Sequence, residues 1–273
     1  MARRIIAAVR RVYPSNSLLS YNPVFKIAGN AVANLLGAPF PQFRTLPPNH
    51  LRVRVGAGTQ IVNNHAHHLQ IGAQFWIECF AKGYVNSAAD IVEIGCGCGR
   101  MALHLDAEYF TGSYLGVDID PEMIEYCRSH FPFPRFAFLL SPHASSTYRR
   151  AESEQPADTF IIAQPETRDF VFSTSLLTHL LENEMRFYLQ ESLRILRPDA
   201  MMVMSFFCLE HVEKGNPWTF AHRIGNAFAD DRNFPEAAVA YRQNYLIGLV
   251  KELGFREAWV SGRPVQSFLI ARK

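Results

Sequence analysis

Three glycines alternate with other residues directly after a short apolar stretch, in the sequence ADIVEIGCGCGRMALHL at 89–105. Gly95, Gly97 and Gly99 follow a predicted strand at 90–94 and lead into a predicted helix near 98–106. Glycine permits backbone angles that other residues avoid, and it lets a ligand approach the main chain closely. Free N–H groups at the start of a helix favour an anionic group of that ligand. The pattern therefore predicts a nucleotide-binding turn.

The spacing of these glycines narrows the class of nucleotide. The dinucleotide-binding fingerprint has the order GxGxxG, which would require glycine at position 100, where this chain has Arg100. The observed order, GxGxG, argues against a nicotinamide or flavin dinucleotide.

An acidic residue ends the second predicted strand, at 114–118. Asp118 lies 23 residues after Gly95, a separation at which a carboxylate stands at the tip of the neighbouring strand and accepts from both hydroxyls of a ribose. Asp120 precedes Pro121, a pair that is typical of a helix start. We therefore expect Asp118 to bind ribose and Asp120 to cap the next helix.

The elements that must position these residues alternate regularly from residue 88 onward. Strands are predicted at 90–94, 114–118, 136–140, 169–173, 201–207, 256–260 and 267–271, and helices near 98–106, 121–130, 182–196 and 237–253. This alternation predicts an α/β domain at 88–273 with a mostly parallel sheet and crossover helices. Residues 1–87 form a separate, basic, helical extension or lid in this scheme.

The N-terminal extension is strongly basic. Residues 1–77 contain eight lysines and arginines and no aspartate or glutamate, whereas the whole chain has a formal charge of +2. The sequence RRIIAAVRRVY at 3–13 has the spacing of a short basic amphipathic helix. Three roles stay open for this helix: a cap on the main domain, a contact with an anionic membrane through residues 1–12, or a mitochondrial targeting segment.

Prolines punctuate residues 13–60 and predict short pieces rather than long elements, arranged as a lid or wrap. The next segment, 60–82, is predicted to be helical and carries His65, His67 and His68. We expect this cluster to form a polar surface or a wall that faces the substrate. A metal is not predicted, because a third and a fourth ligand cannot be placed.

The cysteine pattern and the hydropathy of the chain indicate the cellular compartment of the protein. The five cysteines are scattered without a CxxC pair, so neither a disulfide framework nor a zinc site is predicted. No apolar run approaches the ~20 residues of a transmembrane helix, and the first residues lack the apolar core of a signal peptide. We predict a cytoplasmic protein, with a peripheral membrane contact where residues 1–12 provide one.

Four segments in order resemble the motifs of class I S-adenosylmethionine-dependent methyltransferases. These are VEIGCGCGR, GVDIDPEMIEYCR, DFVFSTSLLTHL and LQESLRILRPDAMMVMSFF. The resemblance covers roughly 88–273, and the C-terminal segments resemble bacterial members that modify glycans or secondary metabolites. It implies a Rossmann-like, seven-stranded, mostly parallel sheet with helices on both faces, and S-adenosylmethionine as cofactor with S-adenosylhomocysteine as product.

The resemblance also assigns cofactor-binding residues. The methionine end of the cofactor would be lined by the first motif, Asp118 would hold the ribose, and the fourth strand would end beside the sulfonium. An acidic residue near the adenine is missing after the third strand, where Ser141 and His143 are the polar candidates. The full set of expected cofactor residues is Glu93, Gly95, Cys96, Gly97, Gly99, Arg100, Asp118, Ile119, Ser173 and Thr174.

The end of the fourth strand bears on the acceptor. It reads Ser-Thr-Ser at 173–175 and lacks an Asn-Pro-Pro-Tyr type sequence, which argues against methylation of adenine, cytosine or glutamine amino groups. A hydroxyl acceptor is favoured, and it benefits from a base such as histidine. His211 is the first candidate, with Glu210 and His179 as alternatives. The segment 208–236, with Trp218, Phe220 and His222, is a predicted substrate wall or lid.

We therefore predict O-methylation of a sugar, a glycan or another hydroxylated metabolite, with this small molecule or glycan as the partner. Methylation of nitrogen or carbon on a natural product stays open. A noncatalytic methyltransferase-like subunit also stays open, because of the missing acidic residue near the adenine. A nucleic acid is disfavoured, because the basic extension has no dense lysine stripe.

Overall fold

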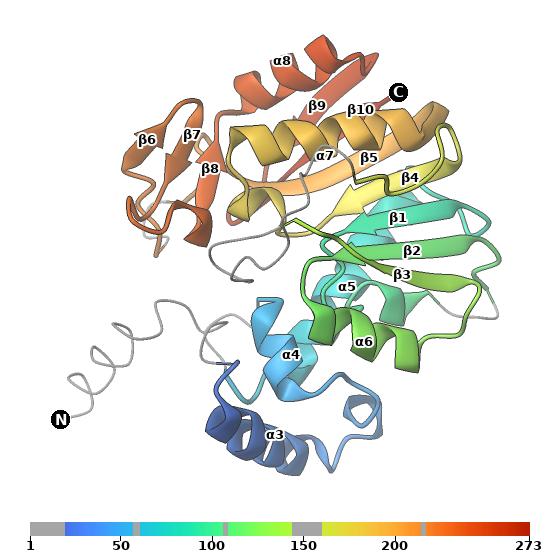
Figure 1. The fold of residues 1–273 in the computed structure, drawn as a ribbon, viewed down its shortest axis with the longest axis vertical. Helices are drawn as coiled ribbons and strands as arrows, with labels where there is room; N and C mark the ends of the chain where they lie inside the picture. The colour runs from blue at the N-terminus through green and yellow to red at the C-terminus, as the bar shows by residue number, and fades with distance from the viewer. Residues whose placement is uncertain (1–19, 57–60, 106–108, 144–159, 214–216) are drawn as a thin grey trace.

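A twisted sheet with helices on both faces forms the centre of the molecule (Figure 1). The computed structural model describes residues 20–56, 61–105, 109–143, 160–213 and 217–273. Five parallel strands lie in the order β3-β2-β1-β4-β5. Their bounds are Asp90–Ile94 for β1, Ser113–Asp118 for β2, Phe136–Leu140 for β3, Arg168–Ser173 for β4 and Leu196–Cys208 for β5. β10 (Ser267–Arg272) pairs antiparallel with both β5 and β9 (Glu257–Ser261).

These seven strands match the seven that the sequence predicts, and three short strands are added to them. β6 (His222–Ile224), β7 (Ala227–Ala229) and β8 (Val239–Tyr241) extend the sheet from the far end of β5. β6 and β7 lie within the segment 208–236 that we interpreted as a substrate wall or lid, and β8 lies within the predicted helix at 237–253. Their packing explains the difference, since Phe207, Phe220 and Ala240 form a small core of their own beside Trp218.

Strict alternation along the strands separates two hydrophobic layers. Ile91 and Phe170 face one layer, whereas Val92 and Val171 face the other. The first layer is covered by α5 (His65–Ala81) and α6 (Pro121–His130), and the second by α7 (Glu182–Ile195) and α8 (Gln243–Leu253). Successive apolar residues of a strand enter opposite layers because their side chains point to opposite faces of the sheet. The predicted sheet with helices on both faces is therefore confirmed.

The helix boundaries differ from the prediction at two places. The predicted helix at 237–253 begins only at Gln243, because residues 239–241 pair with β5 and β7. The predicted helix near 98–106 is wrong: the chain makes turns and a single 3-10 turn, Ala102–His104. The indole N–H of Trp76 donates to the Met101 carbonyl at 2.9 Å, and Leu105 N bonds to Ala102 O instead. Met101 O also accepts from His104 N at 3.1 Å, so this segment makes 3-10 bonds while Trp76 ties it to α5.

The N-terminal extension contains a long helix, which corrects the prediction of short pieces only. α3 runs from Pro23 to Gly37, followed by the 3-10 turn Pro41–Phe43 and by α4 (Asn49–Arg54). Pro23 lies in the first turn of α3 and Pro39 lies beyond its end, so neither interrupts the helix. Asn22 caps the helix by accepting from Val24 N at 2.9 Å. The predicted amphipathic helix at 3–13 lies outside the described residues.

Both N-terminal helices lie below the sheet in Figure 1, on the side of α5 and α6. α3 packs on α4, and α4 packs on α6 through Leu51 and Met123. In the described ranges, no helix combines the length and apolar character needed to cross a bilayer.

Candidate active site

The turn after β1 has the backbone conformation that only glycine adopts easily. Gly95, Gly97 and Gly99 have φ angles of +80°, +53° and +77°. The turn is tied to β2, because the N–H groups of Gly95 and Cys96 both donate to Val117 O, at 2.7 and 3.0 Å. A methyl group at Gly97 would lie 2.2 Å from Val55 Cγ1, so the end of α4 sits directly on the turn. Glycine is required here both for conformation and for this approach.

Cys96 contributes its backbone to the turn rather than its side chain. The thiol is 2 % exposed and lies against Gly116, where an added Cβ would be 2.9 Å from Cys96 Sγ. All five cysteines are free and buried. The expected role of Cys96 at the cofactor is thus limited to its main chain.

Asp118 lies at the end of β2, beside the glycine turn. Its Oδ2 accepts from Gly97 N at 2.7 Å and its Oδ1 accepts from Asp120 N at 2.9 Å. A carboxylate has about four lone-pair positions, so each oxygen can accept one further hydrogen bond from a ribose hydroxyl. Burial raises the pKa of Asp118 to about 6, although the backbone N–H groups oppose this rise. The side chain therefore fixes two loops while retaining acceptors for a ligand.

Asp120 caps α6, as the sequence predicts. Its Oδ1 accepts from Glu122 N at 2.9 Å. Ile119, between the two aspartates, is partly exposed. The structure thus brings the two predicted aspartates to one loop and separates their contacts.

Glu93 is more enclosed than we expected for a residue that lines the cofactor. It is 1 % exposed and accepts a hydrogen bond from the Tyr114 hydroxyl. Burial raises the pKa of Glu93 to about 8, against the lowering effect of that hydrogen bond and of the Arg100 charge. Glu93 is therefore largely neutral at pH 7.

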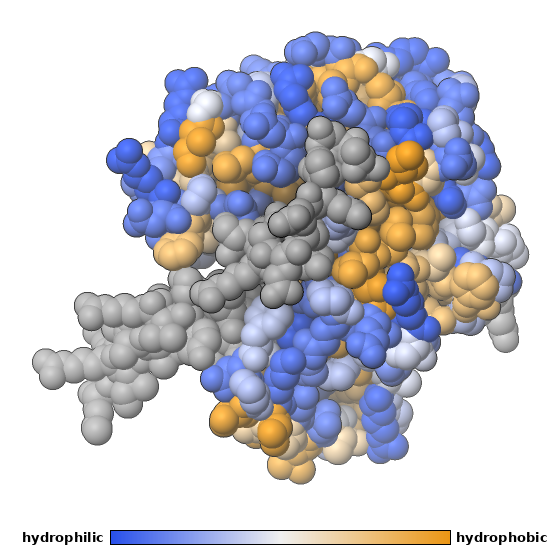
Figure 2. Space-filling model, viewed as in Figure 1, coloured by the Kyte–Doolittle hydropathy of each residue, from blue (hydrophilic) through white to orange (hydrophobic). Residues whose placement is uncertain are grey.

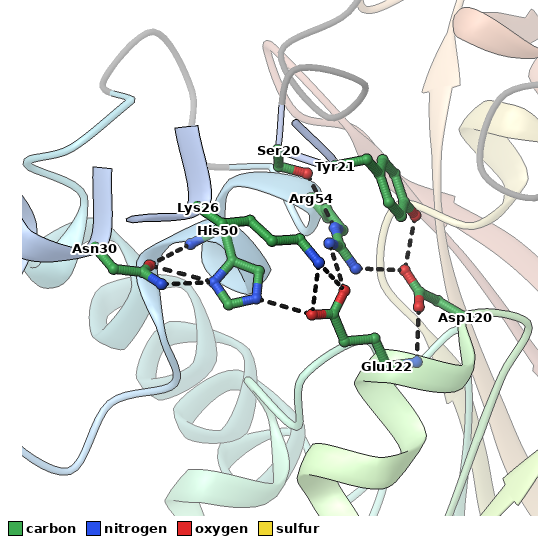
Figure 3. Close-up of polar contacts among 8 residues, drawn as sticks. All are labelled: Ser20, Tyr21, Lys26, Asn30, His50, Arg54, Asp120 and Glu122. Atoms are coloured by element: carbon green, nitrogen blue, oxygen red, sulfur yellow. Dashed lines mark hydrogen bonds and ion pairs between the residues drawn. The ribbon is translucent and has the colours of Figure 1, made fainter. Parts of the chain in front are cut away.

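A cluster of charged residues joins the N-terminal extension to this loop, and sequence reasoning missed it (Figure 3). Arg54, 5 % exposed, donates to Asp120 Oδ2 at 2.9 Å and to Glu122 Oε2 at 2.6 Å. Its guanidinium carbon lies 3.8 Å from the centre of the Tyr21 ring. The Tyr21 hydroxyl in turn donates to Asp120 at 2.7 Å. We call this set the Arg54 clamp.

Glu122 receives two further contacts in the clamp. Lys26 Nζ lies 2.9 Å from Glu122 Oε1, and His50 Nε2 lies 3.1 Å from the same atom. Burial would raise the pKa of Glu122, but the hydrogen bonds from Lys26 and Arg54 lower it to about 2. One sequence feature pointed to such contacts: the basic residues of 1–77 have no acidic residue in that segment to pair with.

The histidine cluster of α5 is divided between two environments. His65 stacks on Phe43 with ring centroids 4.9 Å apart, and His68 is buried near Arg100 and Arg52. Both are nearly inaccessible, at 2 % and 3 %, so the expected polar surface is wrong for these two residues. His67 is half-buried. Among the described residues, no group of three His, Cys, Asp or Glu side chains could hold a metal ion.

At the ends of β4, β5 and β10, hydroxyl and amide side chains form a second cluster on the same edge. Ser175 N donates to Ser205 Oγ at 2.6 Å, and both hydroxyls donate to Gln266 Oε1, at 3.1 and 2.8 Å. Ser175 has a φ of +62°, which is strained for a residue with a side chain. Backbone strain of the kind seen at Ser175 is common at functional sites. Ser173 is fully buried and its Oγ has no partner among the described residues, while Thr174 is partly exposed.

The two candidate histidines occupy different places on this edge. His179 ends the 3-10 turn Leu177–His179, which begins after Leu176; an added Cβ on Gly95 would lie 3.5 Å from Leu176. His179 Nδ1 donates to Glu236 O at 2.8 Å, so Nε2 carries the lone pair. His211 instead lies against Gly262, with Nδ1 3.0 Å from Ser267 Oγ.

Two other candidates have defined contacts. Glu210 Oε2 accepts from Gln243 N at 3.1 Å, and Arg242 lies 3.5 Å from Glu210 Oε1. This carboxylate is therefore occupied by the start of α8. The wall residues Trp218 and Phe220 pack against Phe207, whereas His222 is exposed on β6.

A polar group is present after β3, where the expected acidic residue is missing. His143 Nδ1 lies 2.5 Å from the Tyr188 hydroxyl and 3.1 Å from Ser141 Oγ. These side chains offer donors and acceptors of the kind that an adenine ring uses. Together with the glycine turn and the spare acceptors of Asp118, they make the donor set suitable for S-adenosylmethionine.

Comparisons with known proteins agree with this geometry. Residues 92–204 match the family model described as a methyltransferase domain. An S-adenosylmethionine-dependent methyltransferase from Archaeoglobus fulgidus is similar in structure, with a TM-score of 0.53 at 15 % identity over 76 % of this chain and 94 % of that chain.

Two further solved structures share the fold. The methyltransferase from Methanosarcina mazei has a TM-score of 0.50 at 19 % identity, over 71 % of this chain and 96 % of that chain. The one from Mesorhizobium loti has a TM-score of 0.50 at 16 % identity, over 72 % and 97 %. The chain therefore matches a methyltransferase domain over residues 92–204 and shares the fold of the S-adenosylmethionine-dependent enzymes.

Proposed function

We propose that the protein methylates a hydroxyl group of a sugar, a glycan or another hydroxylated metabolite. S-adenosylmethionine is the methyl donor and, when bound, supplies an electrophilic methyl group on a sulfonium. One observation carries the choice of acceptor: at the ends of β4, β5 and β10, Ser175, Ser205 and Gln266 form a cluster of hydroxyls and an amide. Such groups hold a hydroxylated molecule by hydrogen bonds without a competing ion pair.

His179 is the base that we propose for the hydroxyl proton. Burial lowers the pKa of His179, so the ring is neutral near pH 7 and able to accept a proton. The bond from Nδ1 to Glu236 O fixes the tautomer and leaves the lone pair on Nε2. His179 is also close in sequence and structure to Leu176, which lies over Gly95. His211 has no such link to the glycine turn and becomes the second candidate.

Methyl transfer with labelled S-adenosylmethionine tests this assignment. A panel of hydroxylated sugars and metabolites is compared with matched amines, using wild type, His179→Ala and the control His211→Ala. We expect transfer to hydroxyls and a loss of about 10²- to 10⁴-fold in kcat for His179→Ala, the usual contribution of a general base. Transfer to amines alone, unaffected by His179→Ala, would instead favour N-methylation.

We also propose that the protein is located in the cytoplasm, a reducing compartment, and that its N-terminal extension contacts an anionic membrane surface there. The outer face of α3 supports this, because Val24, Ile27 and Leu35 are 73 %, 76 % and 76 % exposed. Figure 2 shows apolar side chains over this helix at the lower end of the molecule. The four arginines within residues 1–12, with no acidic residue among them, suit an anionic lipid.

Sedimentation with vesicles tests the membrane contact. Wild type should sediment with vesicles rich in phosphatidylserine and stay in solution with neutral ones. Leu35→Glu should abolish this binding, whereas Val265→Glu, at a residue that is 57 % exposed in the turn before β10, should not. Equal sedimentation of all three proteins would show that α3 does not make the membrane contact. A dimer that Leu35→Glu dissociates would show that α3 binds a second copy of the chain instead.

A further inference from the structure

Arg52 is a buried cation, and one nitrogen of its guanidinium lacks a hydrogen-bond partner among the described residues. It is 2 % exposed, and its Nε and Nη1 donate to neutral acceptors, Asn64 Oδ1 at 2.7 Å and Pro47 O at 2.6 Å. Its Nη2 has no hydrogen-bond partner within the described residues, and no carboxylate is among the groups there that act on its charge. Burial lowers the pKa of Arg52 to about 10, so the side chain stays charged at pH 7. A buried charge without a counterion is costly.

A second unsatisfied group lies beside it. His68 on α5 is 3 % exposed, and its Nε2 also has no partner in the part of the chain that the structure describes. The pKa of His68 lies well below its usual value, first because of burial and then because of the charges of Arg100 and Arg52. The ring is thus neutral and can donate one N–H to an anion.

Arg100 completes a positively charged group of three elements. Its Nη1 donates to Val55 O at 2.8 Å, at the end of the helix that carries Arg52. α5 touches the same turn, since an added Cβ on Gly72, one turn after His68, would lie 2.9 Å from Arg100 O. Glu93, the nearby carboxyl that acts on Arg100, is itself largely neutral. The group therefore carries two positive charges without a matching negative charge.

The Arg54 clamp holds α4 in the position that this arrangement requires. Arg52 and Arg54 are two residues apart on the helix and so point to different sides. Arg54 faces Asp120 and Glu122 (Figure 3), whereas Arg52 lies near Cys98 of the glycine turn. The clamp thereby fixes one cation while the other is presented to the cofactor region.

We propose that Arg52, with His68 and Arg100, binds the α-carboxylate of S-adenosylmethionine, so that the N-terminal extension supplies part of the cofactor site. This proposal rests on the proposed function. The planar guanidinium donates parallel N–H groups that match a carboxylate. The cofactor has only one carboxylate, which is part of its amino-acid end. Arg100 lies on the glycine turn and contacts the end of α4, so it would hold the same carboxylate together with Arg52.

Calorimetric titration with two donors tests the proposal. S-adenosylmethionine is compared with its decarboxylated form, which keeps the sulfonium and the amine and lacks only the carboxylate. Wild type should bind S-adenosylmethionine about 10- to 100-fold more tightly than the decarboxylated compound, the range expected for a charge-assisted hydrogen bond. Arg52→Met should remove this preference by weakening S-adenosylmethionine alone. Arg52→Lys, which keeps the charge and loses the fork, should retain part of it.

Arg44→Met is the matched control, because Arg44 is exposed and donates only to Ala38 O. It should leave both affinities unchanged, and thermal unfolding of each variant checks that it is folded. Equal weakening of both compounds by Arg52→Met would show that Arg52 merely supports the lid and would overturn the proposal. An unchanged preference would overturn it as well. Failure of wild type to bind either compound would instead contradict the proposed function.

Discussion

The two parts of the carboxyl edge of the sheet are held together by different chemistry. At the ends of β1 and β2, ion pairs and carboxylates dominate, because Arg54 joins Asp120 and Glu122 while Asp118 ties two loops. At the ends of β4, β5 and β10, the contacts join hydroxyls and one amide. The charged part holds the N-terminal extension against the loop after β2, and we propose that it lies on the donor side while the hydroxyl and amide cluster lies on the acceptor side. Variants that affect one part and spare the other should separate donor binding from acceptor chemistry.

The largest effect on stability is expected from the Arg54 clamp. Arg54→Met leaves the nearly buried Asp120 without its cation, and breaking a buried pair in this way costs about 3–5 kcal/mol. Lys26→Met is the matched control, because this residue is about one-third exposed and its pair should contribute no more than about 1 kcal/mol. Urea unfolding measures both. Equal losses for the two variants would show that burial of Arg54 does not determine the strength of the clamp.

The next largest effect on stability is expected where the end of α4 contacts the glycine turn. Gly97→Ala should destabilise the protein by about 2–4 kcal/mol, since alanine at a φ of +53° is strained and its methyl group would collide with Val55. The double variant with Val55→Ala should recover the part that is due to the collision. Gly248→Ala is the control within α8, where an added Cβ meets no atom within 4 Å, and it should be neutral or slightly stabilising.

The smallest effect is a pH dependence of donor binding. Asp118 in the free protein has a pKa of about 6, and the ribose hydroxyls require its ionised form as acceptor. Binding is then coupled to loss of a proton, so affinity should fall by up to about tenfold per unit as pH decreases below 6 and stay level above it. Calorimetric titrations from pH 5 to 8 measure this slope. Asp118→Asn should bind more weakly and show no such slope; a slope that persists in this variant would assign the titration to another group.

The sequence predicted the parts of the molecule that depend on local pattern. The strand β1, the glycine turn and the Asp120 cap are each determined within a few residues, and the structure has all three. The parallel sheet followed from the spacing of apolar segments.

The remaining features depend on contacts between distant residues. Arg54 and Asp120 are 66 residues apart, so nothing in either local sequence indicates their ion pair. The segment after the glycine turn makes 3-10 bonds instead of the expected α-helix, and it is bonded to Trp76, which lies 25 residues before Met101. β8 forms because residues 239–241 meet the end of β5, although their sequence also suits a helix. Tertiary contacts outweigh local preference in each case.

Titration of wild type and Asp118→Ala with S-adenosylhomocysteine tests the donor site by itself, because it needs no knowledge of the acceptor. We expect saturable binding by wild type and an affinity about 10- to 100-fold lower for Asp118→Ala, which corresponds to roughly 1.5–3 kcal/mol for hydrogen bonds to a charged group. Absence of binding to wild type, or equal affinity of the two proteins, would contradict a donor site built on the glycine turn and Asp118.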